Sequence, residues 1–496
     1  MAYRLTREDL EGTFEDPAAV VAAWNPNPEV LKALLNLYFT ELESVPPGRK
    51  DPTLEIWSPN ANSPGAIYGT YESPLTAAIR ANLPENVETL LAAGADPTGI
   101  TLNYLSDYAT RFIRGRDGKT DMSSFAMCPP RSRILAVAEG KGITQQLQPL
   151  TQAELDERGK GFPRFWTEPN LPGQRLRLSK ALTALEVAAG LGRDDMFHRI
   201  REAGADESAW TSSSEASQLE FDETKPSFMS TSSPVHEAIA NGQPVMLRKL
   251  LYEYHYSPNY RPLANPTVAL PPLSFALARC DLKKPGVWAC VEELLRHGDL
   301  DTNLRSPIFD IHPLHLAVAH HDPDILSRLP MSLDSAGSTA LGHTLLHVAS
   351  LPLTSKNIDK ENPASTQSIH CARTVDSKWL PHQLPSPMHL DPTMKRGYGL
   401  TRPAVPLQYQ RAIPLTPSEQ EAQLQTLHIL VRVGIDVRAQ DVDGNTALHY
   451  LAATVNVDPR ALQLLRGMDG GEEVYEDYQN MAGVTPRALW ESQSEI

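Results

Sequence analysis

The sequence feature that most constrains the fold is a helix–turn–helix pattern at residues 433–453, VGIDVRAQDVDGNTALHYLAA. Gly434 is placed to end one helix, because glycine readily adopts the left-handed conformation that closes helices. The polar residues at 443–445 favour a turn, and Thr446 is a good N-cap for a second helix. A helix pair this short cannot bury its apolar face alone, so it predicts a stack of similar units.

Copies of this pattern recur along the chain. The clearest begins at Ser73 and continues to Pro97, with proline and leucine after the N-cap, and with Asn82 and Gly94 where left-handed residues would end its two helices. Further copies begin at Thr183, Ser233, Pro271, His312, Thr344 and Thr485. These motifs resemble ankyrin repeats, from about residue 71 to residue 490, most closely at 71–97, 181–207, 312–329 and 424–466.

The resemblance implies an all-α ankyrin-repeat solenoid of helix-turn-helix repeats with hairpin-like turns. We expect roughly seven to nine repeats, interrupted by long irregular inserts. The openings at Thr344 and Thr446 lie 102 residues apart, whereas the family period is about 33. Proline-rich composition favours an insert there over hidden repeats, and the divergent repeats with such inserts resemble ankyrin proteins of filamentous fungi.

The spacing of the motifs predicts six regions, which follow one another from the N-terminus. They are an N-terminal helical capping region and loop at 1–70, repeats at 71–207 with an insert at 98–179, a Ser/Thr-rich loop at 208–232, repeats at 233–351, a Pro-rich insert at 352–417, and C-terminal repeats and a cap at 418–496. In the first region, helices are predicted at 17–24 and 29–42, with Val30, Leu31 and Leu34 in one apolar stripe.

Composition restricts the function. The formal net charge of -15 disfavours direct binding of nucleic acid, which needs clustered Lys and Arg. Four scattered cysteines do not make a disulfide framework, and the sequence shows neither a secretory leader nor an apolar run long enough to span a membrane. We therefore expect a monomeric intracellular protein of the cytoplasm or nucleus.

No motif supports catalysis, a metal or a cofactor. His343 and His347 stand four residues apart but lack the glutamate of a zinc protease. The resemblance to ankyrin repeats implies a structural histidine at the fourth position of an opening, which is occupied by His236, His315, His347 and His449. The histidines and cysteine at 370–389 lack the paired spacing of a zinc site. The Gly-Lys-Thr at 118–120 lacks the first glycine of a phosphate loop. We predict no enzyme activity.

The resemblance implies a protein-interaction scaffold or adaptor, which binds an unidentified protein on a concave face made by the turns and the ends of the first helices. The residues predicted on this face are Phe309, Ile311, Arg80, His320, Asp443 and Asn445. Phe309 and Ile311 are the strongest candidates, since apolar residues at turn positions can anchor a partner. The alternative for these two is burial under a neighbouring insert. An enzyme site formed by the inserts, and a nuclear regulatory cofactor, stay open as other functions.

Overall fold

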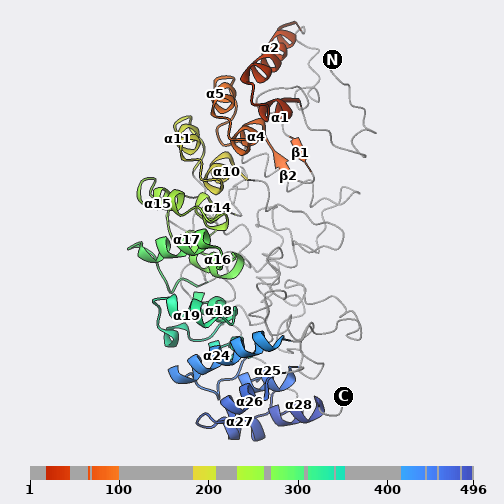
Figure 1. Ribbon diagram of the computed structural model, residues 1–496, viewed down its shortest axis with the longest axis vertical. Coiled ribbons are helices and arrows are strands. Elements are labelled where there is room, and N and C mark those ends of the chain that lie inside the picture. The colour runs from red at the N-terminus through yellow and green to blue at the C-terminus, as the bar shows by residue number, and fades with distance from the viewer. Residues whose placement is uncertain are drawn as a thin grey trace, which may run out of the picture.

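The protein is an elongated stack of short antiparallel helix pairs (Figure 1). The computed structural model describes the chain in segments, namely residues 18–44, 65–67, 70–99, 182–207, 210, 232–261, 270–305, 311–339, 342–351, 415–441, 444–454, 457–480 and 483–493. Within them lies one small strand pair, in which β1 (Gly65–Ile67) runs antiparallel to β2 (Thr70–Glu72), with Ala66 opposite Tyr71. The fold is all-α apart from this hairpin.

Each repeat contributes a first helix to an inner row. These helices pack one on the next from end to end, in the order α1 (Ala18–Ala23), α4 (Pro74–Arg80), α10 (Ala184–Gly190), α14 (Pro234–Ala240), α16 (Pro272–Arg279), α18 (Pro313–Val318), α20 (Leu345–Ala349), α25 (Ala447–Ala453) and α28 (Pro486–Gln493). Helix α4 packs directly on α10, and α20 on α25, although the members of each pair lie far apart in the sequence.

The second helices form an outer row, seen beside the inner one in Figure 1. They are α2 (Pro28–Ser44), α5 (Pro84–Ala92), α11 (Asp194–Glu202), α15 (Pro244–Tyr252), α17 (Pro285–Arg296), α19 (Pro323–Arg328), α24 (Pro417–Val433) and α26 (Pro459–Arg466). A 3-10 helix at Leu333–Ala336 packs on α18, and α27 (Gly471–Asp477) lies against α26 and α28. The stack of helix pairs confirms the predicted fold class.

Local sequence explains where these helices begin and end. The Ser73 hydroxyl accepts a hydrogen bond from the Thr76 amide, and the Thr76 hydroxyl accepts one from the Ser73 amide, which completes a capping box. Asn82, which follows α4, and Gly94, which follows α5, are left-handed, with φ 59° and φ 83° respectively, as predicted. Gly434 closes α24 in the same conformation, with φ 83°.

The N-terminal pair was predicted with small errors. Helices α1 and α2 form at the expected place and pack against α4 and α5, as a first repeat would. Leu31 is fully buried, but Val30 is 41% exposed, so Val30 does not belong to the buried stripe. The expected stripe was wrong at this residue because α2 has only one neighbouring pair to pack against.

The inner row is buried nearly all round. Every residue of α10, α18, α20 and α25 is buried, including the aromatic ring of Tyr450. The leucines at the third position of three openings, Leu75, Leu185 and Leu448, are at most 1% exposed and belong to the continuous core. The exposed surface of the described helices therefore lies mainly on the outer row.

Close packing between repeats leads to one prediction. A Cβ built on Gly286 in α17 would lie 2.6 Å from the carbonyl oxygen of Gly242, which is backbone and cannot rotate away. We expect Gly286→Ala to lower the free energy of unfolding by about 1–3 kcal/mol through overpacking. Gly298, just beyond the same helix, has nothing within 4 Å of its Cβ position and serves as the control. Urea denaturation that finds equal stability for the two alanine variants would contradict this packing.

Candidate functional site

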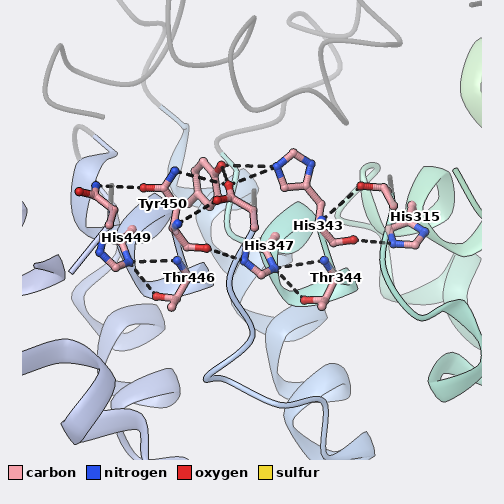
Figure 2. A network of polar contacts seen from close by, with 11 residues as sticks. His315, His343, Thr344, His347, Thr446, His449 and Tyr450 are labelled. Atoms are coloured by element: carbon pink, nitrogen blue, oxygen red, sulfur yellow. Dashed lines mark hydrogen bonds and ion pairs between the residues drawn. The ribbon is translucent and has the colours of Figure 1, made fainter. Parts of the chain in front are cut away.

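A polar ladder joins the repeats along the starts of the first helices (Figure 2). In His347, Nδ1 accepts hydrogen bonds from the Thr344 amide at 3.1 Å and from its hydroxyl at 2.8 Å. On the other side of the ring, Nε2 lies 3.0 Å from the carbonyl oxygen of Asn445, in the next repeat. A carbonyl oxygen only accepts, so Nε2 carries the proton and the imidazole is the neutral Nε2–H tautomer.

The same bridge recurs at four junctions between repeats. Each histidine stands at the fourth position of its opening, and its Nε2 faces the carbonyl oxygen of a residue in the next turn. The pairs are His236 with Leu270, His315 with His343, His347 with Asn445, and His449 with Val484. The structural role that the resemblance implied for these histidines is confirmed.

Three of the accepting carbonyls, those of His343, Asn445 and Val484, belong to turns of one design. Asp441 illustrates it: its amide donates to the Asn445 carbonyl at 2.8 Å, and its carboxylate accepts from the Asn445 amide at 2.8 Å. The turns at 339–343 and 480–484 close by the same pair of bonds, with Thr339 and Asn480 in the place of Asp441. The carbonyl oxygen of Asn445 thus receives two donors, one from its own turn and one from His347.

Burial keeps three of these histidines neutral. Desolvation lowers the pKa of His315 to about 3, that of His347 to about 4 and that of His449 to about 4. At neutral pH they are therefore unprotonated, and both ring nitrogens of His347 and His449 have structural partners. None of the three is poised to exchange a proton near pH 7 as a general acid or base would.

A buried carboxylate lies beside this ladder at the junction of α20 and α25. Asp441 accepts a hydrogen bond from the Tyr450 hydroxyl at 2.5 Å, and its Oδ2 lies 3.4 Å from Nε2 of His343. The side chain of Asp441 has no solvent exposure, and that of His343 only 4%. Burial raises the pKa of Asp441, but the hydrogen bond and charge of His343 outweigh it and set this pKa at about 2.

This cluster holds two distant parts of the chain together. Residues 342–351 and 415–454 are separated in the sequence by residues 352–414. Asp441 and His343 nevertheless lie in contact. Gln423 of α24 adds two bonds, from its Nε2 to the carbonyl oxygens of Ala349 at 2.9 Å and Leu351 at 3.1 Å. These buried hydrogen bonds, made by the side-chain nitrogen of Gln423 and by the Asp441 carboxylate, favour one register between the two parts.

Two of the predicted partner-binding residues are buried. Ile311 is 3% exposed and belongs to the hydrophobic core, so the expectation that it lies at an exposed turn is wrong. Asn445 is fully buried, and its Oδ1 accepts from Nδ2 of Asn480 at 3.1 Å. For Asn445 the cover includes Asn480 of the next repeat, which a single repeat would lack.

The other predicted residues differ in placement. Arg80 lies at the end of α4, a third of its side chain exposed, with Nε 3.0 Å from a carboxylate oxygen of the buried Glu72. His320 is half-buried and its Nε2 bonds the Leu277 carbonyl oxygen. Phe309 and Asp443 lie outside the described residues. The structure therefore brings Arg80 and His320 to partly exposed positions on different repeats.

Among the described residues, no group of three or more His, Cys, Asp or Glu side chains is arranged to hold a metal ion. His343 and His347 have ring centroids 5.9 Å apart, and Nε2 of His347 is already engaged by Asn445. The segments 370–389 and 118–120, whose sequences were compared with a zinc site and a phosphate loop, lie outside the described residues. In the part of the chain that the structure covers, no helix is long and apolar enough to cross a membrane.

Sequence reasoning missed a second ladder, made of ion pairs between neighbouring second helices. Its members are Glu88–Arg199, Asp194–Lys249, Arg248–Glu293, Glu292–Arg328 and Glu421–Arg460. Pairs whose two side chains are both exposed stabilise by only about 0–1 kcal/mol, whereas in Arg248–Glu293 the carboxylate is 6% exposed. No sequence signal identifies the partners, because each lies one repeat away across connections of unequal length.

Comparisons with known proteins add little to this geometry. No family model matches the chain, and no curated protein matches it. Among solved structures the chain is similar to the ankyrin repeat domain of Bcl-3, described as a unique member of the IkappaB protein family. The identity is 21%, over 62% of this chain and 95% of that one, and the TM-score is 0.24. A likeness this weak assigns no function. The helix pairs, capped starts and bridged turns give the described residues the arrangement that the resemblance to ankyrin repeats implies.

Proposed function

We propose that the protein is a non-catalytic interaction scaffold that binds a protein partner on the face formed by the turns and the ends of the first helices. The observation that carries this proposal is the ladder of four buried histidines, whose Nε2 atoms bond four turns to the first helix of the preceding repeat. Such cross-links hold successive turns in a fixed relation, and a preorganised surface loses less conformational entropy when it binds.

The burial of the inner row refines this proposal. Ile311 and Asn445 are buried and therefore offer no surface to a partner, whereas Arg80 and His320 reach partly exposed positions. Phe309 and Asp443 complete the proposed face as turn residues. We further propose that the protein acts as a monomer in the cytoplasm or nucleus, and that its ligand is neither a cofactor nor nucleic acid.

An affinity capture with the full chain tests this function. Phe309→Asp is expected to remove at least one partner protein that the unchanged chain retains, because a charge at an apolar anchor opposes binding. Ile311 is not a suitable second substitution, since a charge at a site 3% exposed would unfold the repeat. Val433→Asp, at a residue 39% exposed on α24, is the matched control. If Phe309→Asp and Val433→Asp retain the same partners as the unchanged chain, the proposed face is wrong.

A further inference from the structure

The outer row carries an exposed apolar stripe that the fold does not require. Val245 of α15 is 70% exposed and Tyr252 is 45% exposed, and both belong to the few large apolar side chains that the described residues leave in solvent. They stand seven residues apart on one helix, with Arg248 between them at the same face. The Tyr252 ring is held against the His297 ring, with centroids 4.9 Å apart. The tyrosine is thus fixed in place while nearly half of it faces solvent.

Three arginines from three repeats continue this surface. Arg248 of α15 and Arg296 of α17 both bind the carboxylate of Glu293, through Nη2 at 2.6 Å and Nη1 at 2.6 Å respectively. Arg328 of α19 and Arg296 share Glu292, at 3.3 Å and 3.5 Å. Three guanidinium groups therefore meet two carboxylates, so the cluster keeps a positive charge in a chain whose formal net charge is -15.

The arginines are held in place but not covered. The side chains of Arg248 and Arg296 are each 61% exposed, and that of Arg328 is 49% exposed. Arg328 is fixed by the ring of Trp288, which its guanidinium covers at 3.8 Å from the centroid. Glu293 is 6% exposed, and the hydrogen bond from Arg248 lowers its pKa, so its negative charge persists at neutral pH. A guanidinium has five N–H groups, and these pairs use only some of them.

We propose that Val245, Arg248, Tyr252, Arg296 and Arg328, here named the outer arginine patch, bind a protein segment that carries acidic side chains beside an apolar one. Carboxylates of the segment accept from the outward N–H groups of the arginines, which suit planar bidentate contacts. The apolar side chain of the segment lies between Val245 and Tyr252. Tyrosine and arginine held rigid at a surface are the residue types that concentrate binding energy in protein interfaces.

The outer arginine patch is distinct from the face formed by the turns. The proposal that it binds a protein segment rests on the proposed interaction function. Stability alone explains the pairing of Arg248 with the buried Glu293, but it does not explain a valine 70% exposed beside it. A second copy of this chain is the competing occupant. Charge disfavours it, because copies with a formal net charge of -15 repel each other.

Selection of a phage-displayed random peptide library on the full chain tests the patch. We expect the enriched peptides to carry Asp or Glu close to an aromatic or aliphatic residue, and their affinity to fall with added salt. A synthetic peptide of the most enriched sequence should bind Val245→Asp and Tyr252→Ala at least about tenfold more weakly in fluorescence anisotropy. Val433→Asp makes the same substitution at an exposed valine of α24 and should bind as the unchanged chain does.

Each other result overturns the patch. Enriched peptides that bind Val245→Asp and Tyr252→Ala unchanged place the site elsewhere, which removes the patch but leaves the interaction function standing. Basic or purely apolar peptides contradict the proposed chemistry, and so does a library without enrichment. If light scattering shows dimers that Val245→Asp dissociates, the occupant is a second copy. Circular dichroism of the variants guards against unfolding, and Val245→Asp is expected to fold because residue 245 is 70% exposed.

Discussion

Acidification from pH 7 towards pH 4 is expected to unfold the histidine-bridged repeats. The folded-state pKa values of His315, His347 and His449 are about 3, about 4 and about 4, against an ordinary value of 6.5. Within this window the unfolded chain binds protons that the folded chain excludes. The stability is therefore complete above pH 6.5 and is lost as the pH falls towards the folded values. Each histidine contributes up to about 1.4 kcal/mol per pH unit.

The physical cause of this loss is that a second ring proton on His347 would have no hydrogen-bond acceptor. A proton on Nδ1 of His347 would point at the Thr344 amide, a donor that it now accepts from at 3.1 Å. Protonation thus breaks the helix cap and buries a charge at the same time. Asp441, with a pKa of about 2, stays ionised throughout the window, so its contribution is lost only at lower pH.

Urea denaturation at a series of pH values checks this expectation. The free energy of unfolding should fall steeply below pH 6.5. His347→Gln should lower this free energy at pH 7, and its slope against pH should correspond to about one bound proton fewer than in the unchanged chain. Because a repeat stack can unfold in stages, the slope is read from the transition that includes the C-terminal repeats. A slope equal in His347→Gln and the unchanged chain would show that this histidine does not titrate as its burial requires.

The repeats were predictable because their determinants are local. An N-cap such as Ser73, a left-handed residue such as Asn82 and a small or apolar residue in the short first helix act within a few positions of one another. The histidine at the fourth position was assigned to structure by the resemblance to ankyrin repeats, and the bond from His347 to Asn445 bears this out. The ankyrin-like unit at 433–453 was thus a reliable guide to the weaker copies.

The site was less predictable because exposure depends on the neighbouring repeat. Nothing in the sequence around Ile311 or Asn445 says that the adjacent turn covers them. The Asp441–His343 contact joins residues on opposite sides of a long sequence gap, and the pairing of Arg248 with Glu293 depends on the register of two repeats. Such pairings follow from the stacking geometry, which a single sequence does not specify.

Removing the buried carboxylate of Asp441 is expected to cost about 3–5 kcal/mol of unfolding free energy. Asp441→Ala would leave the Tyr450 hydroxyl and the Asn445 amide without the acceptor that they now share, both in a fully buried position. It would also leave His343 without its carboxylate partner at 3.4 Å. The effect should concentrate at the junction of α20 and α25, where hydrogen exchange of the α25 amides should accelerate.

Two further variants distinguish the lost hydrogen bonds from other effects of the substitution. Asp441→Asn keeps the shape and one acceptor oxygen, so we expect a smaller loss, about 1–3 kcal/mol. Asp469→Ala removes a carboxylate whose side chain is 99% exposed, and should leave the stability within experimental error of the unchanged chain. If Asp441→Ala is as stable as Asp469→Ala, the cluster does not hold the two parts of the chain together. In that case the α20–α25 junction depends on its apolar contacts and on the bond from His347 to Asn445.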